Sequence, residues 1–235
     1  MNTRQQQILE AIIREHQKTS EPVASQVLFE KYNFDLSPAT IRSEMLALDE
    51  EGLLLQPYHS AGRVPTTKAY RLFVNRLLER QEAGSADFEK VKRGMALFDP
   101  DKDFSLNLAQ FLADFSQSLG LSGSFGEEVD FHGAGLPFLL EDPEFDQPSD
   151  MLDILRGFDS LEKQFIDLFE EIGKDVEVFI GEENPIDDLE RCSLVISGYK
   201  AGAKKGFVGI LGPKRMNYAR NIFLVEQTKK VIENN

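Results

Sequence analysis

The chain has 235 residues, of which 26 are basic and 40 acidic, so its formal net charge is -14. A hydrophobic share of 41% is enough for a folded core and excludes a wholly disordered chain. Taken over the whole molecule, the charge argues against a polyanionic partner such as DNA or an anionic membrane. No run approaches the roughly 18 apolar residues that span a bilayer, and no apolar leader is present. We therefore expect a cytoplasmic protein with no membrane partner.

The negative charge is confined to one part of the chain. Residues 1–80 hold ten basic and ten acidic residues, so the remaining 155 residues carry the whole excess. Within the first segment, residues 63–80 contain five cations and a single acid, Glu79. Such an asymmetry often separates a polyanion-binding module from an acidic regulatory or assembly module. Surface charge also varies without a functional cause, so composition leaves both interpretations open.

Two helices are predicted at the start of the chain. Ile and Leu at helical spacing predict a helix over residues 3–18, with Thr3 as its N-cap. Pro22 stands where it can open a second helix, since proline is favoured in the first turn. Residues 33–36 are predicted to form the turn that follows.

The third helix has the clearest sequence signals. Ser37 is the expected N-cap, and Pro38 occupies the first helical position. Gly52 is expected to end the helix. The residues predicted to face the core are Ile41, Met45 and Leu48.

A two-stranded ribbon and a fourth helix are predicted next. Residues 53–55 and 63–64 have the character of two short strands, and the turn-forming residues 57–62 lie between them. Thr66 or Thr67 can cap the fourth helix. Three helices, a ribbon and a helix in this order predict a winged helix-turn-helix over residues 1–80.

The rest of the chain is predicted to be a linker, residues 81–102, followed by an α+β domain with an antiparallel sheet, residues 103–235. Helices are expected at 104–119, from 149 or 150 to 172, and at 217–232. Strands are expected at 176–180, 193–199 and 207–211, with a hairpin at 201–206. Residues 121–150 show no clear period, so no regular structure is predicted there.

In a winged helix the third helix enters the major groove of DNA. Arg42 can form a bidentate contact with guanine, Thr40 and Ser43 can donate and accept hydrogen bonds, and Ala39 can meet a thymine methyl group. His59, Ser60 and Arg63 are predicted at the tip of the wing, where they can touch the backbone or the minor groove. The same polar residues would also suit a solvated surface or a protein-assembly module. The candidate DNA-binding residues are Ser37, Pro38, Ala39, Thr40, Arg42, Ser43, His59, Ser60, Arg63 and Lys68.

Two strings in the first segment resemble a known family. LSPATIRSEM at residues 36–45 and SAGRVPT at residues 60–66 closely resemble the N-terminal domain of the bacterial heat-inducible transcription repressor family, HrcA. The resemblance extends almost without gaps through residues 4–78. Two such strings at the right separation are highly specific.

A second resemblance lies in the last third of the chain. The strings GEENP, CSLV and GILGPKRMNY resemble the closing half of the GAF-like domain of the same family. The segments that carry these strings, and two shorter ones that fit the same domain, are 181–185, 192–195, 209–218, 131–135 and 144–145.

The resemblance implies a repressor of chaperone genes that binds an inverted-repeat operator as a homodimer, with the chaperonin as a further partner. It also implies a winged helix joined to a reduced GAF-like domain. The inserted domain through which the family is described as dimerising is absent here, near residues 125–129. Gln26, Ser43 and the Tyr58–His59 pair replace residues usual in the family, and Gln26 and Ser43 could weaken or retune operator contacts. An alternative is a GAF-like sensing or protein-interaction module whose winged helix no longer binds DNA specifically.

No enzyme or metal centre is indicated. His16, His59 and His132 have no second His or Cys at ligand spacing, so no metal is expected. Cys192 at the start of a predicted strand is expected to be a buried structural thiol. We expect no catalytic residues and no cofactor.

Four phenylalanines lie in the acidic, unperiodic stretch at residues 121–150. Such residues could fill the core of a shortened sheet. They could also mark a marginal region that opens on warming or exposes a chaperonin-binding surface. These residues are Phe125, Phe131, Phe138 and Phe145.

Overall fold

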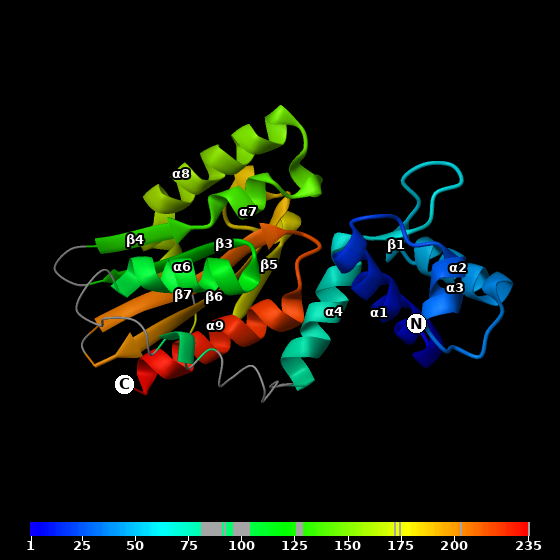
Figure 1. Ribbon diagram of the computed structural model, residues 1–235, viewed down its shortest axis with the longest axis horizontal. Helices are drawn as coiled ribbons and strands as arrows, with labels where there is room; N and C mark the ends of the chain where they lie inside the picture. The colour runs from blue at the N-terminus through cyan, green and yellow to red at the C-terminus, as the bar shows by residue number, and fades with distance from the viewer. Residues whose placement is uncertain are drawn as a thin grey trace. The chain divides into compact units, whose positions relative to one another are not determined.

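The computed structural model describes residues 1–80, 91, 93–95, 104–125, 129–171, 173, 175–202 and 204–234. The chain forms two compact units, Met1–Arg80 and Gln81–Asn235. Each unit is described by itself below (Figure 1). The segment expected to link them, residues 81–102, lies largely outside the described residues.

The first unit begins with three helices, α1 (Thr3–Thr19), α2 (Ser25–Lys31) and α3 (Pro38–Glu50). The N-cap of α1 is Asn2 rather than Thr3, because Asn2 and Gln5 form a capping box that satisfies two free amide groups. The prediction that Pro22 opens α2 is wrong. The helix starts three residues later, because the neighbouring Val23 is engaged in backbone pairing with the ribbon.

The ribbon consists of β1 (Leu54–Leu55) and β2 (Val64–Pro65), paired antiparallel. Its base is fastened to the segment between α1 and α2, since Val23 and Arg63 exchange two backbone hydrogen bonds of 2.9 Å. The fourth helix, α4 (Thr67–Arg80), is capped by Thr66, whose hydroxyl accepts from the Ala69 amide. The predicted order of three helices, ribbon and helix is therefore present.

A buried carboxylate joins α1 to α2. Glu15 is 3% exposed, and its oxygens accept from Lys31 at 2.5 Å, Tyr32 at 3.0 Å and Lys18 at 3.2 Å. The hydrogen bond from Lys31, helped by those from Lys18 and Tyr32, lowers the pKa of Glu15 in spite of its burial. The ionised carboxylate thus stabilises the contact between the two helices.

We expect Glu15→Gln to destabilise the first unit by about 1 to 3 kcal/mol, because a hydrogen-bonded ion pair is lost and Lys31 loses its anionic partner. Since the pKa of Glu15 is lower in the folded state, its contribution is complete above the ordinary carboxyl value of 4.5 and disappears as the pH falls below it. Urea unfolding between pH 3 and 7 should show that the free energy of unfolding falls less steeply with decreasing pH in the variant than in the wild type. Equal acid sensitivity in both proteins would contradict this assignment. Glu21→Gln, at an exposed acid outside the network, is the control.

The second unit contains an antiparallel sheet with strand order β4-β3-β7-β6-β5. Strands that are neighbours in this order pair along most of their length. Ile210, for example, lies opposite Gly120 on one side and opposite Val195 on the other. The prediction of an α+β fold with an antiparallel sheet is confirmed. The strands are β3 (Leu119–Phe125), β4 (Val129–Ala134), β5 (Glu177–Ile180), β6 (Cys192–Ala201) and β7 (Lys204–Pro213).

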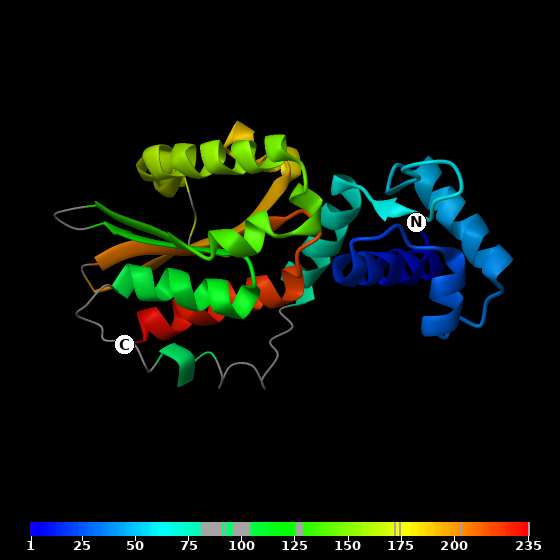
Figure 2. The same cartoon turned by 45° about the horizontal axis from the view of Figure 1, so that its top comes forward.

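Helices cover both faces of this sheet. Figure 2 shows α8 on one side, and α6 and α9 on the other. Three short turns, η1 (Pro143–Phe145), η2 (Gly181–Glu183) and η3 (Asp187–Leu189), complete the unit. The helices whose bounds are described are α6 (Phe104–Ser116), α7 (Leu136–Leu140), α8 (Pro148–Glu171) and α9 (Tyr218–Glu233).

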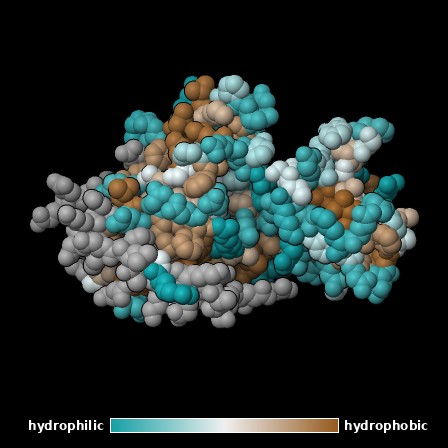
Figure 3. Space-filling model, viewed as in Figure 1, coloured by the Kyte–Doolittle hydropathy of each residue, from teal (hydrophilic) through white to brown (hydrophobic). Residues whose placement is uncertain are grey.

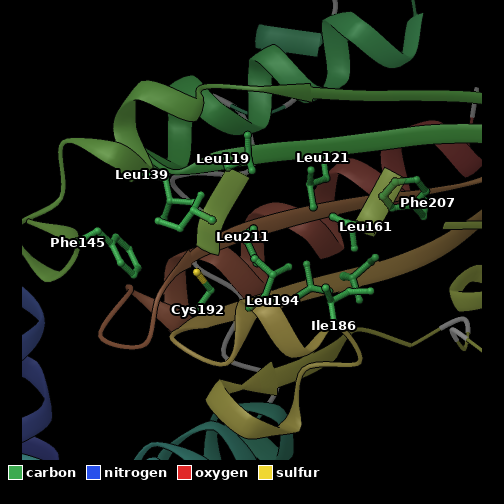
Figure 4. Close-up of a cluster of buried hydrophobic side chains, with 13 residues drawn as sticks. Leu119, Leu121, Leu139, Phe145, Leu161, Ile186, Cys192, Leu194, Phe207 and Leu211 are labelled. Atoms are coloured by element: carbon green, nitrogen blue, oxygen red, sulfur yellow. The ribbon is translucent and has the colours of Figure 1, made fainter. Parts of the chain in front are cut away.

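The main core lies on the α8 side of the sheet (Figure 4). Alternate residues of the central strands point into it, because side chains of a strand alternate between its faces. On the opposite face α6 packs closely, and a Cβ at Gly120 would lie 2.1 Å from the Ala109 carbonyl oxygen. The core residues include Leu119, Leu121, Leu139, Phe145, Leu161, Ile186, Cys192, Leu194, Phe207 and Leu211.

The described part of the stretch 121–150, residues 121–125 and 129–150, has regular structure that the sequence analysis did not predict. It continues β3, forms β4, α7 and η1, and begins α8. The helix expected over 104–119 ends at Ser116, and Leu119 already belongs to the sheet. Phe145 is fully buried, while Phe125, Phe131 and Phe138 pack at the edges of buried clusters. Phe145 therefore belongs to the core, and the other three pack against buried clusters, in agreement with the first interpretation.

Ion pairs with distant residues hold part of this stretch. Asp142 binds Arg215 at 2.5 Å, and Glu144 lies 3.6 Å from the same guanidinium. Asp150, which is 4% exposed, pairs with Arg191. These partners are 41 to 73 residues apart in sequence, so no local pattern indicates them.

The apolar residues of α8 are divided between core and surface. Ile154 and Leu161 are buried, whereas Met151, Leu152 and Leu155 are 37%, 53% and 44% exposed. Figure 3 shows apolar surface over this helix. The side chains expected inward at 165, 166 and 169 lie outside the described residues. Within the described part of the chain, no helix is long and apolar enough to cross a membrane.

Candidate nucleic-acid interface

The N-terminus of α3 is built as the sequence predicts. The Ser37 hydroxyl accepts from the Thr40 amide at 3.1 Å and lies 2.9 Å from the Thr40 hydroxyl. Pro38 is the first residue of the helix. Ile41, Met45 and Leu48 are at most 3% exposed and fix which side of α3 faces the core. Pro38 has no N–H and the Thr40 amide is capped by Ser37, so what the first turn presents to the outside is the partial positive charge of the helix end.

Three of the predicted contact residues share the exposed side of α3. Ala39, Arg42 and Ser43 are all exposed, while Thr40 is half-buried and engaged with Ser37. The Ser43 hydroxyl donates to the Ala39 carbonyl at 3.2 Å. Among the described residues, none forms a hydrogen bond or ion pair with the Arg42 side chain. Arg42 is thus available for an external acceptor.

The loop between β1 and β2 carries the predicted tip residues. Figure 1 shows this loop extending beyond the helices of its unit. His59 and Ser60 are exposed, and Ser60 has a left-handed backbone with φ of +68°. Their neighbour Tyr58 is 65% exposed. Tyr58 was not among the predicted contacts, and its place between Pro57 and His59 in the turn is the signal that could have identified it.

Arg63 does not lie at the tip of this loop. Its backbone is bound to Val23 at the base of the ribbon, and its side chain is 16% exposed with Nε 2.7 Å from an Asp49 oxygen. Because Asp49 lies near the end of α3, this ion pair connects the ribbon to that helix. A phosphate contact by Arg63 would require its release from Asp49.

Lys68 also has a partner within its own unit. Its ammonium donates to the Glu51 carbonyl at 2.8 Å, at the C-terminal end of α3. A cation stabilises this end of a helix, where carbonyl groups are free. Arg63 and Lys68 thus both position α3, whereas Arg42 lies free on its surface.

We expect Arg63→Ala to destabilise the first unit by about 1 kcal/mol, because the half-buried pair with Asp49 is lost. If the pair is purely structural, the slope of log affinity for DNA against log salt should stay unchanged, whereas loss of a phosphate contact would lower it by about one. Binding titrations at several salt concentrations measure the slope. Asp49→Ala is the matched control, since it breaks the same pair and frees Arg63 for DNA.

Most other cations of this unit are also paired with acids. Arg4 lies 3.4 Å from Glu44 and joins α1 to α3. Arg76 lies 3.0 Å from Glu10 and joins α4 to α1. With ten charges of each sign, the unit is formally neutral. Affinity for a polyanion must therefore come from a local surface rather than from net charge.

No metal or nucleophilic centre emerges from the described residues. Within them, no group of three or more His, Cys, Asp or Glu side chains could hold a metal ion. His16 is bound to the Tyr70 hydroxyl at 2.7 Å. Burial raises the pKa of the Cys192 thiol to about 12, and the side chain is 1% exposed in the core. The prediction of a buried structural thiol is confirmed.

Comparisons with known proteins add the following. A family model described as HrcA protein C terminal domain matches residues 71–222. The heat-inducible transcription repressor HrcA of Natranaerobius thermophilus is 28% identical over 326 positions, covering 97% of this chain and 94% of the relative. That of Geobacter sulfurreducens is 25% identical over 333 positions, covering 99% and 97%. That of Alkaliphilus metalliredigens is 50% identical over 82 residues, 35% of this chain and 24% of the relative.

A solved structure described as a hypothetical protein has the same fold, with a TM-score of 0.82 at 20% identity over 100% of this chain and 98% of that one. The class that the relatives define is that of transcription repressors, not of enzymes. Since the family model matches well over half of its residues, the chain belongs to the HrcA family.

Proposed function

We propose that this protein is a sequence-specific DNA-binding repressor of heat-shock (chaperone) genes, acting in the cytoplasm. In this proposal the first unit is a winged helix-turn-helix whose α3 enters the major groove and whose β1–β2 loop touches the DNA backbone. The observation that carries it is the exposed side of α3, where Arg42 has no partner among the described residues. A side chain with five N–H donors suits a guanine edge or a phosphate.

The proposed operator is an inverted repeat bound by a homodimer, because a two-fold protein matches a palindromic site. The second unit would then be a reduced GAF-like domain that assembles the dimer and receives a signal from the chaperonin. The alignment with the Natranaerobius relative has 326 positions, 91 more than this chain has residues. In this proposal the dimer therefore forms through residues that this shorter chain retains.

We place the missing segment between Phe125 and Val129. These two residues are direct partners across the β3–β4 hairpin. A domain can be inserted or removed where the two chain ends lie side by side, since the sheet on either side stays unchanged. The intact five-stranded sheet is consistent with this position.

The test is a selection of binding sites from random DNA with the full chain, followed by gel-shift titrations of the selected site and a scrambled one at several salt concentrations. A selected inverted repeat, bound at least about 1000-fold more tightly than the scrambled site, supports the proposal. Light scattering of the complex should give two chains per operator. A strict monomer on DNA would contradict the two-half-site mechanism.

The alternative is a sensing or interaction module whose winged helix has lost specific binding. The pairing of Arg4, Arg63 and Arg76 with acids of the same unit favours it, as does the long-range repulsion between DNA and the acidic second unit. Under this alternative the selection yields no common site, and the two titration curves coincide.

A further inference from the structure

A residue outside the family strings discussed above completes the exposed side of α3. Leu46 follows Ser43 by three residues and Arg42 by four, so it lies on the same helical face. Its side chain is 51% exposed. Met45 before it and Leu48 after it are buried, at 3% and 0%. The orientation of Leu46 is therefore set by the core packing of its neighbours.

A single exposed leucine needs no functional explanation. The position of Leu46 is what makes it informative. From Ala39 to Leu46 the helix rises about 10 Å, at 1.5 Å per residue, which corresponds to about three base-pair steps of 3.4 Å. Between these two apolar residues lie Arg42 and Ser43, and the exposed Glu50 follows Leu46 by four residues at the end of the helix. From Ala39 to Leu46 the exposed side of α3 thus presents apolar, polar and apolar groups in turn.

A leucine side chain has no donor or acceptor, so it cannot read the hydrogen-bonding pattern of a base. In the major groove the apolar feature of the base edges is the 5-methyl group of thymine. We propose that Leu46 determines specificity by contacting a thymine methyl in each operator half-site, on the far side of the base pair read by Arg42. This inference rests on the function proposed above and names the chemistry of one operator position.

The experiment uses the full chain and an operator obtained by selection with it. Each thymine of the half-site is replaced in turn by deoxyuridine, which removes one methyl group and keeps every hydrogen-bonding group. At one position on the Arg42-distal side, we expect about fourfold weaker binding, the factor that corresponds to one buried methyl group. Leu46→Ala should weaken binding to the thymine operator by a similar factor. For this variant, replacing that thymine by deoxyuridine should cause no further loss of affinity.

A second variant tests the same assignment by gain of a new preference. Leu46→Gln places an amide at this point, and glutamine pairs with adenine through its N6 and N7. Selection with this variant should replace thymine by adenine at that one position and leave the other positions unchanged. Leu78→Ala is the matched control, because Leu78 is an exposed leucine on α4, at 36% exposure, away from α3.

The outcomes separate this inference from the proposed function. If deoxyuridine substitution weakens the binding of wild type and Leu46→Ala equally at every thymine of the selected operator, the role of Leu46 is overturned. The proposed DNA binding is unaffected by that result. The role of Leu46 is also overturned if Leu46→Ala changes the oligomeric state in light scattering while thymine preference persists, because the residue then belongs to a protein interface. If wild-type protein selects no site, both proposals fail.

Discussion

Arg42→Ala should weaken binding to the preferred operator by about 1 to 3 kcal/mol, that is by about 5- to 150-fold, and relax the preference at one base pair of each half-site. The reason is the unpartnered guanidinium on the exposed side of α3, which can offer two parallel donors to a guanine edge. Non-specific affinity should fall much less, because only one cation is lost. Gel-shift titrations of the selected and scrambled sites measure both quantities.

Two further variants show whether Arg42 reads a base or holds a phosphate. Arg42→Lys keeps the charge and loses the bidentate geometry, so it should bind non-specific DNA normally and still lose most of the specificity. Arg14→Ala removes one positive charge from an exposed position on α1 and serves as the control for charge alone. If Arg42→Ala binds its operator as tightly as wild type does, the exposed side of α3 does not lie in the groove.

Gly62→Ala should destabilise the first unit by about 3 kcal/mol and abolish operator binding, the largest expected effect of a single methyl group in this unit. A Cβ at Gly62 would lie 2.4 Å from both the carbonyl carbon and oxygen of Val23, and 2.8 Å from the Ala24 amide nitrogen. These are backbone atoms, so they cannot move without separating the ribbon from the segment between α1 and α2. Hydrogen exchange of residues 1–80 should show the loss of protection.

Gly52→Ala is the matched control for this prediction. Gly52 has φ of +72° and no atom within 4 Å of an added Cβ. Its substitution should therefore cost only the strain of a left-handed alanine, about 1 to 2 kcal/mol, without displacing the ribbon. Equal destabilisation by the two substitutions, with operator binding retained in Gly62→Ala, would show that the ribbon tolerates the methyl group.

The comparison of these two glycines illustrates how far local sequence signals reach. Gly52 was expected to end the third helix, and Gly62 was expected to form part of a turn. Gly52 does, because it ends α3 in the left-handed region. Gly62 instead allows another segment, 39 positions earlier in the chain, to approach its backbone. The distance in sequence is why no local pattern could reveal that requirement.

The same distinction applies to the candidate interface. Ser37 and Pro38 begin α3 as predicted, because capping depends on residues a few positions apart. The exposed face of Ala39, Arg42 and Ser43 follows from the helical period alone. For Arg63, however, charge and position in the turn predicted a tip residue, and the structure places it at the ribbon base beside Asp49.

The second unit shows the largest difference between prediction and structure. Its final helix and its last three strands were predicted at the observed places, because their apolar residues are periodic, although β7 extends over 204–213 rather than 207–211 and shortens the predicted hairpin. Residues 121–150 lack such a period, yet they contribute two strands of the sheet. Gly133 and Gly135 show the reason, since a Cβ at these positions would lie 2.4 Å from the Phe158 ring and 2.6 Å from the Ala113 Cβ. In the sequence, glycines that are required by close packing cannot be distinguished from glycines of loops.

The net charge of -14 and its confinement to the residues after position 80 are determined by the sequence alone, as are the helical face of α3 and the α+β class. Only the tertiary structure decides which cations are free. It engages Arg63 and Lys68 within the first unit and leaves Arg42 exposed. The physical reason is that ion pairs and close backbone approaches join residues distant in sequence, whereas capping and periodicity act within one or two helical turns.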